Sequence, residues 1–125
     1  MTPPRILFVI PGLLAGLLLP AAFVHAPKPA PHGAVGMVSE MFAQRVVTIH
    51  RGERITFVND SRLVHVIGPG RDGHIVSPIG GVPVLGWHLM QTNGVFTTAP
   101  WRTPGTYYLT CSVHPEMNLK VVVTP

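Results

Sequence analysis

Three side chains that can bind a soft metal lie within seven residues near the end of the chain. Cys111, His114 and Met117 follow one another at intervals of three in the segment CSVHPEM. Alternating apolar residues on both sides predict that this segment is a loop between two strands. A fourth candidate, His65, lies upstream, shortly after an apolar stretch that begins at Ile55. Thiolate and thioether sulfur are soft donors and imidazole is intermediate, so these four residue types indicate a transition-metal site.

Two histidines, one cysteine and a weak axial methionine form the trigonal ligand set that proteins use for copper in electron transfer. A structural zinc site would need four Cys or His ligands, and an iron–sulfur cluster would need several cysteines. A c-type haem attachment would need a second cysteine, whereas the chain has only one. A nucleophilic Cys–His pair is an alternative use of Cys111 and His114, but such a pair has no role for Met117.

The sequence around these residues resembles the cupredoxins, the type 1 blue copper proteins. Residues 104–111, PGTYYLTC, resemble the strand that leads into the cysteine ligand of the family. Residues 111–117 resemble the short ligand loop of amicyanin, including the proline after the histidine. Residues 51–59, RGERITFVN, resemble the strand that precedes the first histidine ligand. The resemblance covers about residues 37–125 and also extends to plastocyanin and pseudoazurin.

The resemblance implies one copper ion that cycles between Cu(I) and Cu(II). Its ligands would be His65 and His114 through imidazole, Cys111 as thiolate and Met117 as axial thioether. The resemblance also implies that Asn59, six positions before His65, helps to fix the ligand loops without touching the metal. A plain turn-forming asparagine at a strand end is the alternative for Asn59.

Many relatives carry Asn or Ser directly after the first histidine ligand, where this chain has Val66. Valine loses a polar side chain that would tie the two ligand loops together, but the backbone N–H of Val66 could still reach the Cys111 sulfur. His114 is implied to be the partly exposed ligand. Val113 and Pro115, on either side of it, would line the apolar patch through which electrons pass.

The rest of the chain from residue 35 onward shows alternating apolar and polar residues and no long helical period. Thirteen glycines and fourteen prolines punctuate the chain as turns. We therefore expect residues 35–125 to form an all-β, cupredoxin-like Greek-key β-sandwich. The expected strands are residues 34–39, 47–50, 55–59, 64–67, 74–77, 83–90, 94–98, 105–111 and 118–124. The sequence leaves open a short helical turn within residues 78–93.

The N-terminus has the layout of a secretion signal. Arg5 precedes a 19-residue apolar stretch at 6–24, which is also long enough to cross a bilayer as a helix. Residues 1–26 are therefore expected to be a signal peptide or a membrane-anchor helix, followed by a Pro-rich linker at 27–34. Export would place residues 35–125 outside the cytoplasm, in the periplasm or tethered to the outer face of the cytoplasmic membrane.

Charge and size exclude several classes of function. Nine basic and five acidic residues give a net charge of +4, but beyond the N-terminus the basic residues are scattered singly. Without a basic stripe, nucleic acid is not an expected partner. A single domain of this size cannot supply the second, catalytic copper that copper enzymes of this lineage need, so an enzyme is not expected.

We therefore expect a monomeric carrier that takes single electrons from a donor protein and passes them to an acceptor protein in transient contacts. The alternative is an extracytoplasmic protein that scavenges or delivers copper on the same fold. A second metal at His50, His74 or His88 is left open by the sequence.

Overall fold

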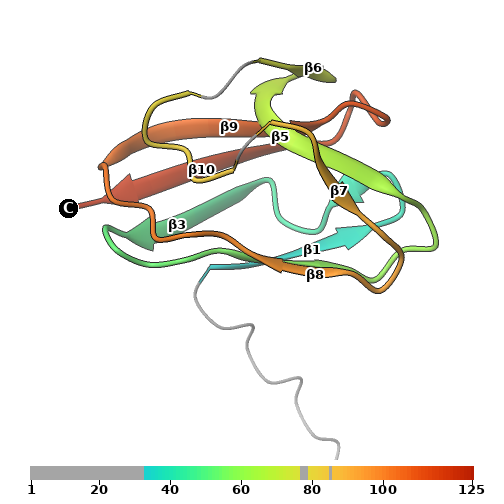
Figure 1. The fold of residues 1–125 in the computed structure, drawn as a ribbon, viewed down its shortest axis with the longest axis horizontal. Coiled ribbons are helices and arrows are strands. Elements are labelled where there is room, and N and C mark those ends of the chain that lie inside the picture. The colour runs from blue at the N-terminus through green and yellow to red at the C-terminus, as the bar shows by residue number, and fades with distance from the viewer. Residues whose placement is uncertain (1–32, 77–78, 85) are drawn as a thin grey trace, which may run out of the picture.

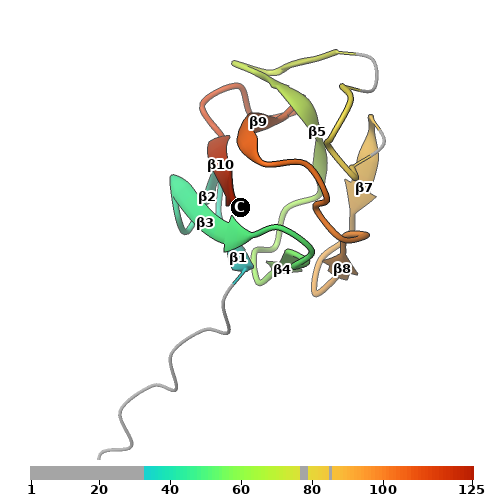
Figure 2. The same cartoon turned by 90° about the vertical axis from the view of Figure 1, so that its left-hand side faces the viewer.

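The computed structural model describes residues 33–76, 79–84 and 86–125, which form two packed β-sheets (Figures 1 and 2). One sheet has the strand order β2 (Met41–Phe42), β1 (Ala34–Val38), β4 (Thr56–Asn59) and β8 (Val95–Thr97). The other has the order β3 (Val46–His50), β10 (Asn118–Thr124), β9 (Gly105–Cys111), β5 (His65–Arg71) and β6 (His74–Ile75), with β7 (His88–Met90) paired to β5. The described residues contain no helix, so the all-β prediction is confirmed for them.

The predicted signal or anchor helix at 1–26 and most of the predicted linker at 27–34 lie outside the described residues. β1 begins at Ala34, directly after a turn at Gly33. Within 33–76, 79–84 and 86–125 there is no helix of the length and apolarity needed to cross a membrane.

Alternation along the strands builds the core between the sheets. On β10, Leu119, Val121 and Val123 are buried, whereas Lys120 between them is exposed. This period of two is what a sheet with one face on the core requires. The largest fully buried side chains include Trp101, Phe57, Met37, Ile49 and Ile55.

β5 is longer than predicted. The strand expected at residues 64–67 begins at His65 and continues through Gly68-Pro69-Gly70 to Arg71. Gly70 has a φ of 151°, and a Cβ there would collide with the carbonyl oxygen of His74. A Cβ on Gly68 would lie 2.7 Å from Cγ2 of Ile75. The two glycines therefore let β6 fold back closely against β5 instead of ending the strand.

One further prediction differs from the structure, and one strand was not predicted. Of the described residues in the predicted strand 83–90, only β7 is a strand, because Trp87 has a φ of 69° that breaks the extended run. The two-residue strand β2 was not predicted, since so short a segment has no visible period.

The register of β5 against β9 brings the candidate ligands together. Ile67 lies opposite Cys111, so His65 at the start of β5 comes close to the end of β9. β9 and β10 pair in antiparallel fashion, and the loop between them carries the other candidate ligands. Figure 1 shows the start of β5 and the β9–β10 loop at the same end of the molecule.

Thr98 provides a test of the core. Its buried hydroxyl accepts hydrogen bonds from the Ile55 backbone N–H and from Nε1–H of Trp101, both at 3.1 Å. Thr98→Val keeps the shape but leaves two buried donors unpaired, so the free energy of unfolding should fall by about 1–3 kcal/mol. Thr106→Val, at an exposed position of β9, should change it by less than about 0.5 kcal/mol. Urea denaturation measures the free energy of unfolding of both variants. Equal losses in the two variants would contradict the role of the Thr98 hydroxyl as a buried acceptor.

Candidate metal centre

His65, Cys111 and His114 meet at one end of the sandwich. Nδ1 of His65 lies 3.2 Å from Nδ1 of His114. The Cys111 Sγ lies 3.9 Å from the His65 nitrogen and 3.7 Å from the His114 nitrogen. Among the described residues, no other group of three or more His, Cys, Asp or Glu side chains is arranged to hold a metal ion.

The spacing of the three atoms fits a transition-metal ion. The three atoms form a triangle with sides of 3.2, 3.7 and 3.9 Å. The point equidistant from the three atoms lies about 2.1 Å from each of them. Bonds from nitrogen and thiolate to zinc, an ion of similar size to copper, are about 2.0–2.3 Å long. An ion could therefore bind in the plane of these atoms without rearrangement.

Met117 adds the thioether to this donor set. Its side chain is fully buried, and its backbone N–H donates to the carbonyl of His114 at 2.9 Å. Its own carbonyl accepts from the Cys111 N–H at 3.1 Å and from the Thr110 hydroxyl at 3.2 Å. These bonds close residues 111–117 into a tight loop. The four predicted residues are thus positioned as a type 1 copper site.

The two histidines differ in environment. His65 and Cys111 are fully buried, whereas His114 is partly exposed, as expected. Burial lowers the pKa of His65 below its ordinary value, and the neighbouring His114 lowers this pKa further. Both effects favour the neutral imidazole, which is the form that binds a metal.

Backbone groups tie the two ligand segments together. The N–H of Val66 lies 3.4 Å from the Cys111 Sγ, so the contact expected from the sequence is present. In return, the Ser112 N–H donates to the carbonyl of Val66 at 2.9 Å. β5 and the ligand loop are therefore joined without a polar side chain at position 66.

The amide of Asn59 is buried among backbone groups. Its Nδ2 lies 2.8, 2.9 and 3.3 Å from the carbonyl oxygens of Leu63, Gln91 and Met90. Its Oδ1 accepts from the N–H of Ser61 at 3.1 Å and from the Ser61 hydroxyl at 2.7 Å. Asn59 therefore connects the loop that precedes His65 with the end of β7.

Ser61 was not identified from the sequence. It is 7% exposed, and its hydroxyl lies 2.9 Å from Nε2 of His65. A small polar residue between Asn59 and His65 belongs to no motif, and serine is common in turns. Only the three-dimensional contact reveals that it touches a candidate ligand.

The exposed edge of the centre is apolar. Val113 is 55% exposed, and Pro115 is also exposed, on either side of His114. Leu63 and Val64, directly before His65, are exposed as well. The two predicted residues of the electron port are therefore at the surface beside the partly exposed ligand.

The three other histidines of the described residues, His50, His74 and His88, do not belong to this centre. Nδ1 of His50 lies 2.8 Å from the hydroxyl of Thr124, and His74 is exposed on β6. The ring of His88 stacks on Phe96 with 3.6 Å between centroids, and burial lowers the pKa of His88. None of the three belongs to the metal-holding group in the described part of the chain.

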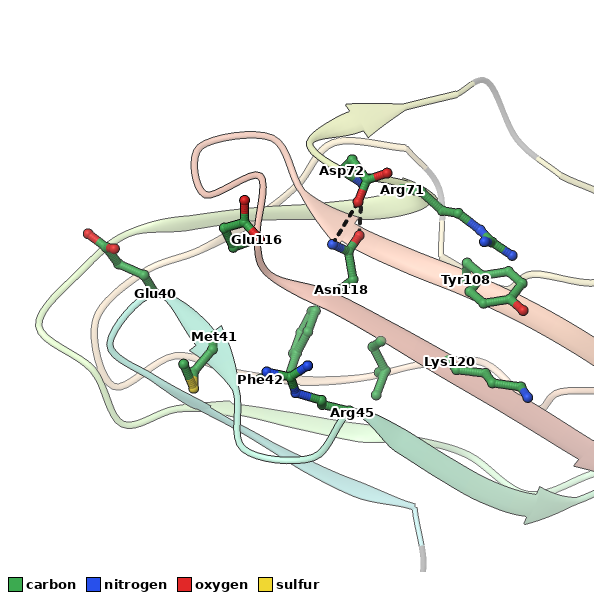
Figure 3. Close-up of a pocket in the computed structure, with 11 residues that line it drawn as sticks. Glu40, Met41, Phe42, Arg45, Arg71, Asp72, Tyr108, Glu116, Asn118 and Lys120 are labelled. Carbon is green, nitrogen blue, oxygen red and sulfur yellow. Dashed lines mark hydrogen bonds between the residues drawn. The ribbon is translucent and has the colours of Figure 1, made fainter.

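A groove of about 390 Å³ is lined by residues of β2, β5, β9 and β10 and of the loops next to them (Figure 3). The Arg71 guanidinium lies 3.3 Å over the ring of Tyr108 at one end of it. Glu116 and Asn118, which flank Met117 in sequence, also line the groove. None of the four candidate ligands lines it, so the groove is distinct from the metal centre.

The difference in exposure between the two histidines is testable. External imidazole can replace the side chain lost in His114→Gly, because that position opens to solvent, but cannot enter the buried site of His65→Gly. We expect both variants to bind copper at least about tenfold more weakly than the unmodified chain. Millimolar imidazole should restore copper retention on desalting only in His114→Gly. Equal rescue of both variants would show that the burial assignment is wrong.

Comparison with known proteins agrees with this geometry. No family model and no curated protein matches the sequence. The structure is similar to amicyanin from Paracoccus versutus, with 24% identity, a TM-score of 0.60, and coverage of 78% of this chain and 85% of amicyanin. It is also similar to a purple cupredoxin from Nitrosopumilus maritimus, with 18% identity, a TM-score of 0.58, and coverage of 74% of this chain and 99% of that protein. The resemblance seen in the motifs is thus confirmed, and the chain has the cupredoxin fold.

Proposed function

We propose that this protein carries single electrons between redox proteins by means of one type 1 copper ion. The observation that supports the proposal is the triangle of His65 Nδ1, His114 Nδ1 and Cys111 Sγ, whose centre is about 2.1 Å from all three atoms. When bound there, copper supplies the Cu(I)/Cu(II) couple. The residues hold one geometry for both oxidation states, because the closed loop and the strand register fix the donor positions before the metal arrives.

The residues around the centre have distinct proposed roles. Val66 donates its N–H toward the Cys111 sulfur and so tunes the thiolate, while Asn59 fixes the loop that carries His65. Val113 and Pro115 form the apolar contact at which a partner protein approaches the edge of His114. A carrier needs only this one centre and a docking surface, so we propose a carrier and not an enzyme.

Burial distinguishes the carrier from the copper-handling alternative. A protein that delivers or scavenges copper needs ligands that exchange readily with a partner. Here His65, Cys111 and Met117 are all fully buried and only His114 is partly exposed. This arrangement favours a retained ion and a transient exchange of electrons.

We also propose that residues 1–26 direct the chain out of the cytoplasm, as a cleaved signal or as a retained anchor. The proposal rests on the single Arg5 followed by the apolar stretch at 6–24. Donor and acceptor would then be extracytoplasmic redox proteins.

Spectroscopy of the copper-loaded full chain tests the function. Addition of Cu(II) should give an intense thiolate-to-copper absorption band in the visible range and a narrow copper hyperfine splitting in EPR. Cys111→Ser should lose both signals because the sulfur ligand is gone, whereas His74→Asn, an exposed histidine outside the centre, should keep both. A colourless protein, or a tetragonal Cu(II) spectrum indifferent to Cys111, would instead favour copper handling.

The docking role of Val113 is tested by electron self-exchange between two copies of the protein. Val113→Lys places a charge on each docking face, so like charges meet and the exchange rate should fall about tenfold or more. Val95→Lys is the matched control, because Val95 is 66% exposed on β8 and no part of the centre. NMR line broadening in mixtures of oxidised and reduced protein measures the rate. Equal effects of the two variants would rule out a specific port at Val113.

A further inference from the structure

We propose that Ser61 is a positioning residue of the copper centre, which holds His65 in the tautomer whose Nδ1 faces the metal. The proposal deepens the proposed function and rests on it for its effect on copper. The tautomer itself is a property of the copper-free protein and can be tested separately. One chain of hydrogen bonds, from Asn59 through Ser61 to His65, determines this tautomer.

The first step is the orientation of the Asn59 amide. Three backbone carbonyl oxygens, of Leu63, Gln91 and Met90, lie 2.8–3.3 Å from one end of this amide. Carbonyl oxygens only accept, so this end must be the NH₂ group. The N–H of Ser61, a donor, lies 3.1 Å from the other end, which must therefore be Oδ1. Both ends of the amide give the same assignment.

The second step is the position of the Ser61 proton. A hydroxyl has one proton to donate and two lone pairs that accept. The Ser61 Oγ lies 2.7 Å from the Asn59 Oδ1, which has no proton. Two oxygens at this distance need a proton between them, so Ser61 donates to Asn59 and not to the carbonyl oxygen of Leu63, which lies farther away at 3.3 Å. Its lone pairs then face the N–H of Leu63 at 3.2 Å and Nε2 of His65 at 2.9 Å.

The third step assigns the proton of His65. Since the Ser61 hydroxyl proton already points to Asn59, Nε2 of His65 must donate to Ser61. A neutral imidazole carries one proton, so Nδ1 is left with its lone pair. This nitrogen is the one that lies 3.2 Å from Nδ1 of His114 and 3.9 Å from the Cys111 Sγ. Ser61 therefore turns the lone pair of His65 toward the metal position.

The surroundings leave Ser61 without a substitute. His65 is fully buried, and the Ser61 hydroxyl is the only partner of its Nε2 among the described residues. The side chains of the next residues in the sequence, Arg62, Leu63 and Val64, are all exposed. Without the hydroxyl, the Nε2 proton would be buried and unpaired, and the ring would lose its preference for one tautomer.

The expected effect is on copper affinity and on the reduction potential. A partner that accepts from the distal nitrogen raises the basicity of a histidine ligand, and loss of such a partner weakens metal binding by about 10–100-fold. A more basic imidazole favours Cu(II) over Cu(I). If Ser61→Ala lowers the Cu(II) affinity about tenfold more than the Cu(I) affinity, the potential rises by about 59 mV.

The first experiment determines the tautomer in the copper-free full chain. ¹⁵N NMR of the histidine rings should show that Nε2 of His65 is protonated and its Nδ1 is not. The His65 signals are identified as those missing from the spectrum of His65→Gln. Ser61→Ala should show a mixture of the two tautomers. A His65 ring protonated at Nδ1 in the unmodified protein would overturn the proposal, whatever the protein does with copper.

The second experiment compares copper binding in three variants. Ser61→Ala should lose copper at least tenfold faster than the unmodified chain to a chelator, with a higher potential and a changed EPR spectrum. Ser61→Thr keeps the hydroxyl and should restore all three towards the original values. Thr98→Val also removes a buried hydroxyl, but away from the centre, so it should lower stability and leave the copper signals unchanged.

These outcomes separate the two proposals. A Ser61→Ala protein that keeps its potential, EPR spectrum and copper off-rate overturns the role of Ser61, as does an equal change in Thr98→Val. If Ser61→Ala does not fold, the tautomer of the unmodified protein decides. An unmodified chain without a type 1 spectrum would overturn the electron-carrier function, but the expected tautomer would still support the assignment of Ser61.

Discussion

The pairing of β5 with β9 is the constraint on which the centre depends. Ile67 lies opposite Cys111, and both are fully buried on the core side of the sheet. Because side chains alternate along a strand, a slip of one residue would turn His65 or Cys111 to the opposite face. The apolar core therefore does more than stabilise the sandwich. By burying Ile67 and Leu109 it selects the one register in which nitrogen and sulfur ligands from distant parts of the chain can meet.

That register holds two imidazoles and a thiol against one another before any metal is bound. The three ligand atoms already lie within 3.9 Å of one another, so the strands need not move for an ion to bind between them. Buried side chains such as Trp101 and Phe57 stabilise the sandwich that holds these positions. A metal ion that binds only to this folded arrangement then stabilises it in turn. The folded arrangement that brings the ligands together is thus also the one that metal binding would stabilise.

Features that depend on residues close together in the sequence were predicted correctly, whereas features that depend on contacts between distant residues were not. The spacing of Cys111, His114 and Met117 lies within one loop, so the sequence alone identified these candidates. Strand alternation likewise predicted β9 and β10 with their observed bounds, because it reflects contact of each strand with one core. The full length of β5 could not be predicted, since Gly68 and Gly70 also occur where strands end, and only the approach of β6 explains them. Ser61 was missed for the same reason, because its role depends on a contact with His65 that no spacing encodes.

Val66 and Ser61 show when the type of side chain matters in such a centre. Valine replaces a polar residue beside a ligand, yet the link between the ligand segments is kept, because the backbone N–H of Val66 reaches the sulfur and its carbonyl accepts from Ser112. The strand register supplies these two bonds whatever the side chain. No backbone group reaches Nε2 of His65 among the described residues, so a side chain must supply that bond. The contact at position 66 thus depends on the backbone alone, whereas the contact at Nε2 of His65 depends on the Ser61 hydroxyl.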